Sequence, residues 1–217
     1  HGVQPTDKPD WSASRAVVWS QYLAQYSNSC PKIEKHAAVG ADSSFIVSLG
    51  RLVPRKGVAW FVEHVLTQLR DLPWIYLIAS DGPERQRIVS LIERLGLTDR
   101  VRLLGEVQDE MLTHLYSAAD LFVMPNIIVH GDVEGFGFVA VEAASHRALV
   151  ISSNTQGIPS AIHDGRNGVL LAVGDALAYA HAIRYWLTHP AERVECGAKA
   201  RTYTLQHFRW DNIAQQY

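Results

Sequence analysis

Cysteine is scarce in this chain: only two of its 217 residues are cysteines, and Cys30 and Cys196 lie far apart in the sequence. They form neither a CxxC motif nor the framework of a disulfide-stapled secreted domain, so that class of protein is excluded. The same scarcity fits a reducing compartment, and we expect a cytoplasmic location. Glycine and proline, at 15 and 9 residues, are too few for a collagenous or low-complexity chain.

The chain also lacks an excess of charge of one sign. It carries 20 Lys and Arg residues against 22 Asp and Glu residues, a formal net charge of −2. Without a basic excess, we expect no nucleic-acid partner. The apolar runs are short and interrupted by charge or glycine, so no segment is predicted to span a bilayer. The N-terminus lacks the basic-then-apolar pattern of a signal peptide.

From Phe45 onward, short β-rich runs alternate with helical stretches. The runs are apolar nearly throughout, which is typical of strands that helices bury on both faces. Right-handed crossovers between such strands predict an α/β fold with a doubly wound, mostly parallel, Rossmann-like sheet. The strands are expected at residues 45–49, 74–79, 101–104, 121–124, 148–152 and 168–173. The helices are expected at residues 58–69, 84–95, 109–118, 138–145, 158–164, 176–187, 190–207 and 210–217.

The first 44 residues differ from the rest. Residues 1–10 are polar and contain two prolines, which indicates a linker. Residues 11–26 have roughly helical spacing of apolar positions, and the following stretch is expected to be loop with some helix. The predicted organisation is therefore a linker with a helical extension at residues 1–44 and one α/β domain at residues 45–217.

Ligands of an open parallel sheet bind outside the carboxyl ends of its strands, so the segments that follow the strands matter most. The loop Gly50–Gly57 follows the first strand and carries Arg51, Arg55 and Lys56. A guanidinium fork and an ammonium on one short loop suit a diphosphate, and the next helix adds its positive N-terminal dipole. The alternative is a solvated basic turn.

A second candidate segment holds Glu134 and Glu142, which are eight positions apart and flank a Gly-Phe-Gly turn. A helix beginning near Gly137 would leave backbone N–H groups free to face an anion or sugar hydroxyls. Glu142 would lie in an apolar part of that helix, where ribose hydroxyls or a salt bridge would satisfy it. The alternative is an ordinary helix N-terminus with both glutamates partly solvated.

Taken in order, the segments after the strands resemble the C-terminal, nucleotide-sugar-binding half of the retaining glycosyltransferases of family 4, which have the GT-B fold. The resemblance covers residues 45–217. The opening HGV resembles that family's interdomain linker, and residues 126–133 resemble an extension found in phosphatidylinositol mannosyltransferase-like members. The segments that carry the resemblance are FIVSLGRLVPRKG, SDGPE, VRLLGEV, ADLFVMPN, DVEGFGFVAVEA, QGIPSAIHDGRNGVLL and the closing HFRWDNIAQQY.

The resemblance implies a role for each matching residue. Arg51 and Lys56 match the pair that binds the donor diphosphate, and with Glu134 they are the expected catalytic residues. Glu134 matches the first glutamate of the E-x7-E motif, beside the transferred sugar, and Glu142 matches the second, which holds the ribose. The other expected donor-binding residues are Gly50, Asp81, Gly82, Val107, Gly135, Phe136, Gly137 and Phe138.

The implied activity is transfer of a sugar from a UDP-, GDP- or ADP-sugar to an unidentified acceptor, with retention at the anomeric carbon. No tightly bound cofactor is implied. A GT-B enzyme also needs an N-terminal domain, so we expect this chain alone to bind donor nucleotide and transfer nothing. Any peripheral membrane association is expected to come through that domain. No metal site is expected, because the ten histidines form no HExxH motif; His130 lies in the presumed donor loop as an ordinary loop histidine.

Two alternatives stay open at this point. The first is a nucleotide-sugar-binding module without catalytic activity. The second is a nicotinamide dehydrogenase, since Gly135, Gly137 and Ala140 fit the G-x-G-x-x-A fingerprint. Ten residues separate that fingerprint from Met124 at the end of the preceding strand, and residues 152–157 include no acid to hold a ribose. The sequence therefore favours the glycosyltransferase over the dehydrogenase.

Overall fold

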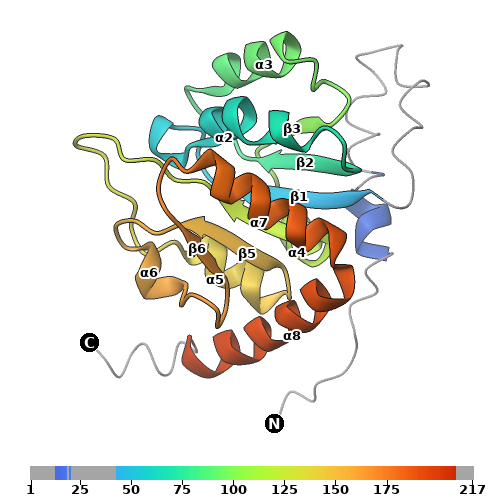
Figure 1. Ribbon diagram of the computed structural model, residues 1–217, viewed down its shortest axis with the longest axis vertical. Helices are drawn as coiled ribbons and strands as arrows, with labels where there is room; N and C mark the ends of the chain where they lie inside the picture. Colours follow the sequence, from blue (N-terminus) through green and yellow to red (C-terminus); the bar gives the residue numbers. More distant parts are fainter. Residues whose placement is uncertain (1–12, 19, 21–42, 209–217) are drawn as a thin grey trace.

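The computed structural model describes residues 13–18, 20 and 43–208. Its centre is a six-stranded sheet of order β3-β2-β1-β4-β5-β6 in which every neighbouring pair is parallel (Figure 1). This doubly wound order confirms the predicted fold class. The strands are β1 (Ser44–Leu49), β2 (Trp74–Ala79), β3 (Val101–Gly105), β4 (Leu121–Met124), β5 (Leu149–Ser153) and β6 (Val169–Leu171).

Helices cover both faces of the sheet (Figure 1). Side chains of α2, α3 and α7 belong to the core on one face, and those of α4, α5 and α6 to the core on the other. The α8 helix packs against α5 and α7. The helices are α2 (Val58–His64), α3 (Arg85–Arg94), α4 (Asp109–Ala118), α5 (Phe138–Ser145), α6 (Ile158–Ala161), α7 (Ala176–Thr188) and α8 (Pro190–His207), with the 3₁₀ turns η2 (Pro54–Lys56) and η3 (Leu66–Leu69).

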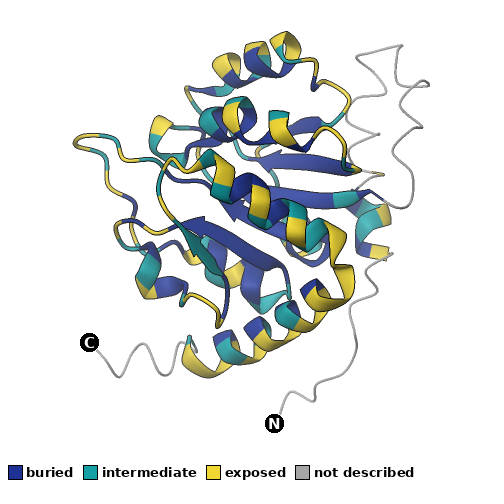
Figure 2. Cartoon of the chain, in the orientation of Figure 1, coloured by how far each residue is buried: buried dark blue, intermediate teal, exposed yellow. Residues whose placement is uncertain are grey.

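The continuous apolar character of the strands follows from this layering. Ile46 and Val123 point into the core beneath α2, α3 and α7, whereas Val47 and Phe122 point into the core beneath α4, α5 and α6. Successive residues of a strand face opposite sides, so the strands of a sheet covered on both faces are apolar at most positions. Figure 2 shows the central strands buried along most of their length.

Most predicted elements are found within a residue or two, and those at residues 74–79, 109–118, 121–124, 138–145 and 190–207 are found with the predicted limits. The expected helix 58–69 is instead divided into α2 and η3. Near the break, Thr67 Oγ1 donates to the carbonyl of Glu63, and Gln68 Nε2 donates to that of His64, so side chains satisfy backbone acceptors there. The strand expected at 168–173 and the helix expected at 158–164 are also shorter. The helix expected at 210–217 lies outside the described residues.

The short N-terminal helical segment is anchored at the amino ends of the strands. Val18 is buried in the core beneath α4 and α5, and Arg15 forms an ion pair with Asp120. Asp120 Oδ1 also accepts from Arg193 of α8 at 2.7 Å, and its Oδ2 accepts from the backbone N–H of Phe45 at 2.7 Å. One buried carboxylate thus joins three parts of the chain on the side of the sheet opposite the candidate site.

No helix in the described part of the chain combines the length and apolarity needed to cross a bilayer. The loops after β1, β4 and β5 gather at the opposite edge of the sheet from the N-terminal segment (Figure 1). Because β1 and β4 are neighbours while the chain winds outward from them in opposite directions, their carboxyl ends form the crevice where ligands of such sheets bind.

Candidate functional site

A small pocket lies at the carboxyl ends of β1 and β4, at the switch in strand order. It brings together the two loops that the sequence singled out, although they are more than 60 residues apart along the chain. Its polar side chains are those of Lys56 from the first loop, Asn126 from the second and Ser48 from β1. The lining residues include Ser48, Gly50, Lys56, Met124, Pro125 and Asn126.

The basic loop after β1 depends on two glycines. Gly50 has φ +141°, and a side chain there would begin 3.2 Å from Cε of Lys56, so the lysine lies across this glycine. Gly57 has φ +67° and precedes α2, and an added Cβ would lie 1.9 Å from the backbone oxygen of Pro125. Only glycine allows the loop to approach the end of β4 this closely.

Glu134 lies at the centre of a polar network beside this pocket. Its Oε2 atom is 2.8 Å from Lys56 Nζ and 3.5 Å from Arg55 Nε, and it accepts a hydrogen bond from Asn126 Nδ2 at 2.8 Å. The glutamate is 7% exposed and Asn126 only 1% exposed. A carboxylate this buried requires charged and hydrogen-bonding partners, and the network provides them.

The environment of Glu134 favours its ionised form. Burial by itself raises the pKa of this carboxyl, but the hydrogen bond and charge of Lys56, the amide of Asn126 and the charge of Arg55 outweigh it. The net effect is a pKa below the usual value of 4.5. The site therefore presents a buried carboxylate paired with a lysine at neutral pH.

This pKa shift predicts a contribution of Glu134 to acid stability. Because the pKa is lower in the folded than in the unfolded chain, the ionised carboxylate stabilises the fold above the unfolded pKa, and this contribution is lost as the pH falls through the folded pKa. The free energy of unfolding of the wild type relative to Glu134→Gln should therefore decrease from pH 7 towards pH 3. Urea denaturation across this range measures it.

Glu93→Gln is the matched control, because Glu93 is exposed on α3 and takes part in no ion pair among the described residues. The free energy of unfolding of Glu93→Gln should change between pH 7 and pH 3 as that of the wild type does. A difference between the wild type and Glu134→Gln that stays constant with pH would contradict the assignment.

The three cations of the basic loop have different surroundings. Arg55 Nη1 pairs with Asp132 Oδ1 at 3.1 Å, and Lys56 pairs with Glu134. Arg51 is exposed, and no ion pair within the described residues involves it. Arg51 is therefore available to an added anion, whereas Arg55 is already committed to carboxylates.

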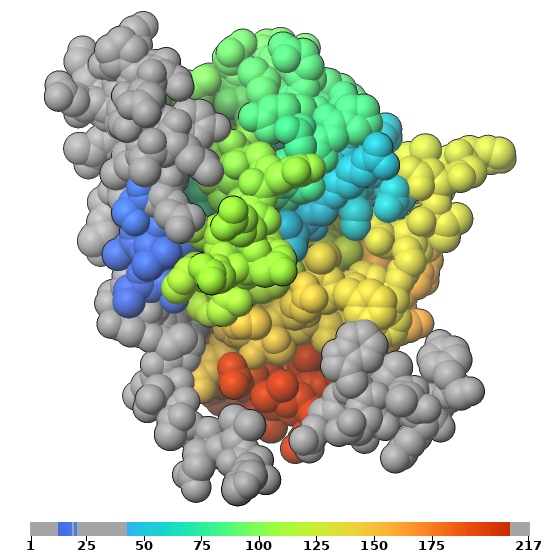
Figure 3. All heavy atoms as spheres, turned by 180° about the vertical axis from the view of Figure 1, so that it is seen from behind, coloured from blue at the N-terminus to red at the C-terminus, as the bar shows by residue number. Residues whose placement is uncertain are grey.

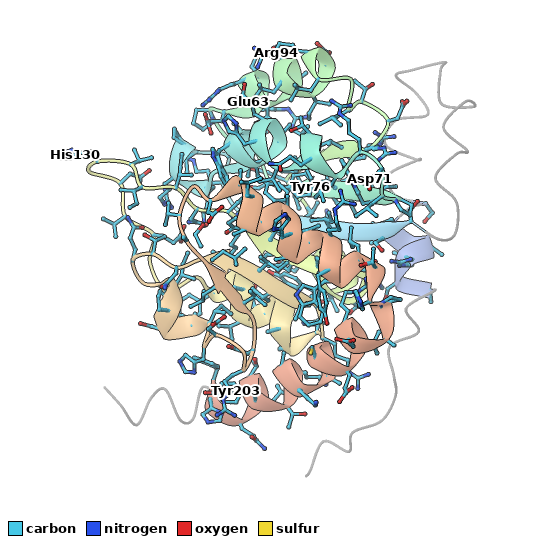
Figure 4. All side chains as sticks on the ribbon, viewed as in Figure 1. Glu63, Asp71, Tyr76, Arg94, His130 and Tyr203 are labelled. Carbon is cyan, nitrogen blue, oxygen red and sulfur yellow. The ribbon has the colours of Figure 1, made fainter. Side chains whose placement is uncertain are left out.

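The segment between β4 and α5 forms a protruding loop (Figures 1 and 3). Val129 and Asp132 pair as an antiparallel bridge, and Gly131, with φ +78°, turns the chain between them. His130 lies exposed at the tip, away from the pocket (Figure 4). The backbone N–H of Ile127 donates to the carbonyl of Arg55 at 2.9 Å, so the base of the loop is tied to the basic loop.

After this loop the chain makes the predicted Gly-Phe-Gly turn into α5. Gly137 is the N-cap, with φ +81°, and no side chain caps the helix. Gly135 is exposed, and the rings of Phe136 and Phe138 pack at a centroid distance of 4.9 Å. An uncapped helix N-terminus has backbone N–H groups that can bind acceptors from a ligand.

Glu142 lies on the exposed side of α5, one helical turn after Phe138. Its Oε2 accepts a 2.7 Å hydrogen bond from the hydroxyl of Tyr116, whose ring stacks on His146. Burial raises the pKa of Tyr116, and the nearby carboxylate raises it further, so the tyrosine stays a hydrogen-bond donor. Glu142 is therefore more exposed than the sequence predicted. Its hydrogen-bond partner is Tyr116 on α4.

The predicted turn Asp81–Gly82 packs against the basic loop. Asp81 Oδ1 accepts from the N–H of Gly82 at 2.7 Å, and the backbone N–H of Leu52 donates to the carbonyl of Asp81 at 2.9 Å. An added Cβ at Gly82 would lie 2.6 Å from the backbone oxygen of Leu52. Val107 lies apart from this contact, half-buried after β3 and packed on the core beneath α4 and α5.

Three residues of the network were not identified as site residues from the sequence: Asn126, Asp132 and Gln156. Gln156, which follows β5, accepts from the backbone N–H of Glu134 through Oε1 and donates to the carbonyl of Asp132 through Nε2 at 3.4 Å. Asn126 and Gln156 each follow a strand at the ligand edge, which is the signal that could have found them. The described residues contain no group of three His, Cys, Asp or Glu side chains arranged to hold a metal ion.

Comparison with known proteins gives the context for this site. Residues 31–203 match the family model described as glycosyl transferases group 1. The lipopolysaccharide core biosynthesis glycosyltransferase LpsE of Rhizobium meliloti is 31% identical over 178 residues, which cover 82% of this chain and 49% of that protein. The GDP-mannose-dependent alpha-(1-6)-phosphatidylinositol monomannoside mannosyltransferase of Mycobacterium tuberculosis is 31% identical over 173 residues, covering 78% and 45%.

A solved structure agrees with these relatives. Anabaena HepE, in complex with UDP and glucose, superposes with a TM-score of 0.70 and is 25% identical, covering 85% of this chain and 49% of that one. The chain thus spans about half the length of the relatives that it matches.

Proposed function

Because the chain belongs to the glycosyl transferases of group 1, we propose that it is the donor-binding half of a retaining glycosyltransferase with the GT-B fold. The donor is a nucleoside diphosphate sugar, and the residues that bind the acceptor, with part of the catalytic apparatus, come from an N-terminal domain. The observation that carries this proposal is the Lys56–Glu134 pair at the junction of β1 and β4, with Arg51 uncommitted beside it. The family assignment also removes the dehydrogenase alternative.

The cations serve the diphosphate. As the bond between sugar and diphosphate breaks, negative charge grows on the leaving group, and preorganised cations next to it lower the barrier. Lys56 is held in place by Glu134, and Arg51 is free to bind two oxygens through its guanidinium fork. Gly50 lets the side chain of Lys56 lie directly against the backbone of the loop.

Glu134 serves the transferred sugar. Its carboxylate is ionised and fixed by Asn126, so it can orient sugar hydroxyls and stabilise positive charge that develops at the anomeric carbon. The Oδ1 atom of Asn126 is buried without a hydrogen-bond partner among the described residues and is available to a sugar hydroxyl. The N–H groups of the turn Gly135–Phe138 would contact the sugar and phosphates from the other side.

The remaining predicted residues serve the nucleoside. Tyr116 donates to Oε2 of Glu142, and among the described residues no hydrogen bond involves Oε1, an arrangement suited to the paired hydroxyls of ribose. The backbone at Val107, after β3, would contact the base. Asp81 and Gly82, which pack against the basic loop, would lie beside the nucleoside. The base itself is left to experiment, because HepE was solved with UDP and the mycobacterial relative is named for GDP-mannose.

Titration of UDP, GDP and ADP into the chain, followed by calorimetry, tests the proposal. We expect one of the three to bind, and the matching monophosphate to bind at least about tenfold more weakly, because it lacks the second phosphate for Arg51 and Lys56. NAD(H) is the control ligand and should not bind. If none of the three diphosphates binds, or NAD(H) binds in their place, the proposed function is wrong. Sugar transfer after an N-terminal domain is supplied would distinguish the enzyme from a non-catalytic binding module.

A further inference from the structure

Gln156 combines an unfavourable backbone with an unusual use of its side chain. Its φ is +52°, and only two other non-glycine residues in the described part of the chain, Ser80 and Arg147, have positive φ. L-residues other than glycine adopt this region at a cost in conformational free energy, and such strain is concentrated at functional sites. Its position after β5 places it at the ligand edge of the sheet.

The side chain of Gln156 holds the backbone on both sides of Val133. Its Oε1 accepts from the N–H of Glu134, and its Nε2 donates to the carbonyl of Asp132 at 3.4 Å. An amide offers an acceptor and a donor on one planar group, so it can satisfy both backbone groups at once. Gln156 is exposed, and burial alone therefore does not account for its conformation.

Gly157 adds a second contact between the turn after β5 and the segment around Glu134. An added Cβ at Gly157 would lie 2.1 Å from the backbone oxygen of Gly135, so the turn after β5 lies directly against the segment that follows Glu134. The turn is itself fixed, because the N–H of Ile158 donates to the carbonyl of Thr155 at 3.1 Å. Residues 156–157 thus contact the loop before, at and after the glutamate.

Glu134 is consequently fixed at both of its ends. Lys56 and Asn126 hold the carboxylate, and Gln156 holds the backbone N–H. We propose that Gln156 is a positioning residue that sets how Glu134 meets the donor sugar, and that it thereby controls affinity for the sugar part of the donor. This inference rests on the proposed function, because it takes the carboxylate of Glu134 to face the sugar.

Two variants test the inference. Gln156→Ala removes the amide bridge and keeps the backbone strain, whereas Gln156→Gly removes both, so urea denaturation should show Gln156→Gly to be more stable than Gln156→Ala. Binding is measured for UDP and UDP-glucose and for GDP and GDP-mannose. Both variants should weaken binding of the sugar-bearing ligand about fivefold, the effect of one lost hydrogen bond, and change binding of the bare diphosphate less than about twofold.

Hydrogen exchange gives a readout that needs no ligand. The N–H of Glu134 should exchange faster in both variants, while Gln86→Ala, a change to an exposed glutamine on α3, should leave exchange and binding unaltered. Equal weakening of the bare and sugar-bearing ligands, or no change in either, would overturn the positioning role. A wild type that binds both ligands equally well also overturns it, whereas a wild type that binds neither refutes the proposed function itself.

Discussion

Replacing Lys56 with alanine should weaken binding of the nucleoside diphosphate about 100-fold, which corresponds to ~2.7 kcal/mol. Two effects add. The diphosphate loses a direct cationic partner, and the carboxylate of Glu134, which Lys56 meets at 2.8 Å, is left to repel it. Calorimetric titration of the diphosphate that binds the wild type measures the change, and a melting curve shows that the variant folds.

Lys199→Ala is the matched control, because Lys199 is exposed on α8 and pairs with Glu195 within the same helix. It should leave binding unaltered. The double variant Lys56→Ala/Glu134→Gln should recover part of the lost affinity, since the repelling charge is gone. An unchanged affinity in Lys56→Ala would show that the diphosphate does not bind at this loop.

Gly57→Ala should lower the free energy of unfolding by roughly 3 kcal/mol. Part of this is the cost of placing an L-residue at φ +67°, about 1–2 kcal/mol. The rest is steric, because the new Cβ would lie 1.9 Å from the backbone oxygen of Pro125 and would push the basic loop away from β4, at a typical cost of about 1–3 kcal/mol. Urea denaturation measures the loss, and diphosphate binding should fall with it.

Gly96→Ala separates the two contributions. Gly96 has a similar φ of +63°, and an added Cβ there meets nothing within 4 Å. It should therefore lose only the backbone part, about 1–2 kcal/mol. If Gly57→Ala proves no more destabilising than Gly96→Ala, the close approach of the two loops is not a feature of the folded protein.

Arg51 and Arg55 show how much of the site could be predicted from the sequence. Their loop could be predicted to bind a diphosphate from its cations and its place after a strand, and the family resemblance selected Arg51 with Lys56. In the structure Asp132 pairs with Arg55, whereas no ion pair among the described residues involves Arg51; the role of Arg51 and Lys56 in binding the diphosphate stays a prediction. Arg55 and Asp132 are 77 positions apart in the sequence. Their ion pair depends on how two loops meet in the fold, so it could not be predicted from a local sequence pattern.

Glu142 and Gln156 show where the sequence fell short. Glu142 was expected in an apolar setting, satisfied by ribose hydroxyls or by a salt bridge, yet Tyr116 from another helix already satisfies one of its oxygens. Gln156 belongs to a segment that carries the family resemblance but was given no role of its own, because a glutamine in a loop is ordinary until its two backbone partners are known. In both cases the decisive partner comes from a different element.

The sequence by itself determined the architecture and the edge of the sheet that carries the site. Strands that are apolar at nearly every position are typical of a sheet between two layers of helices, and parallel strands place all of their following loops on one edge. The tertiary structure decided which of those loops meet. The order β3-β2-β1-β4-β5-β6 makes β1 and β4 neighbours, and this adjacency, which arises from packing of the whole chain, brings Lys56 to Glu134.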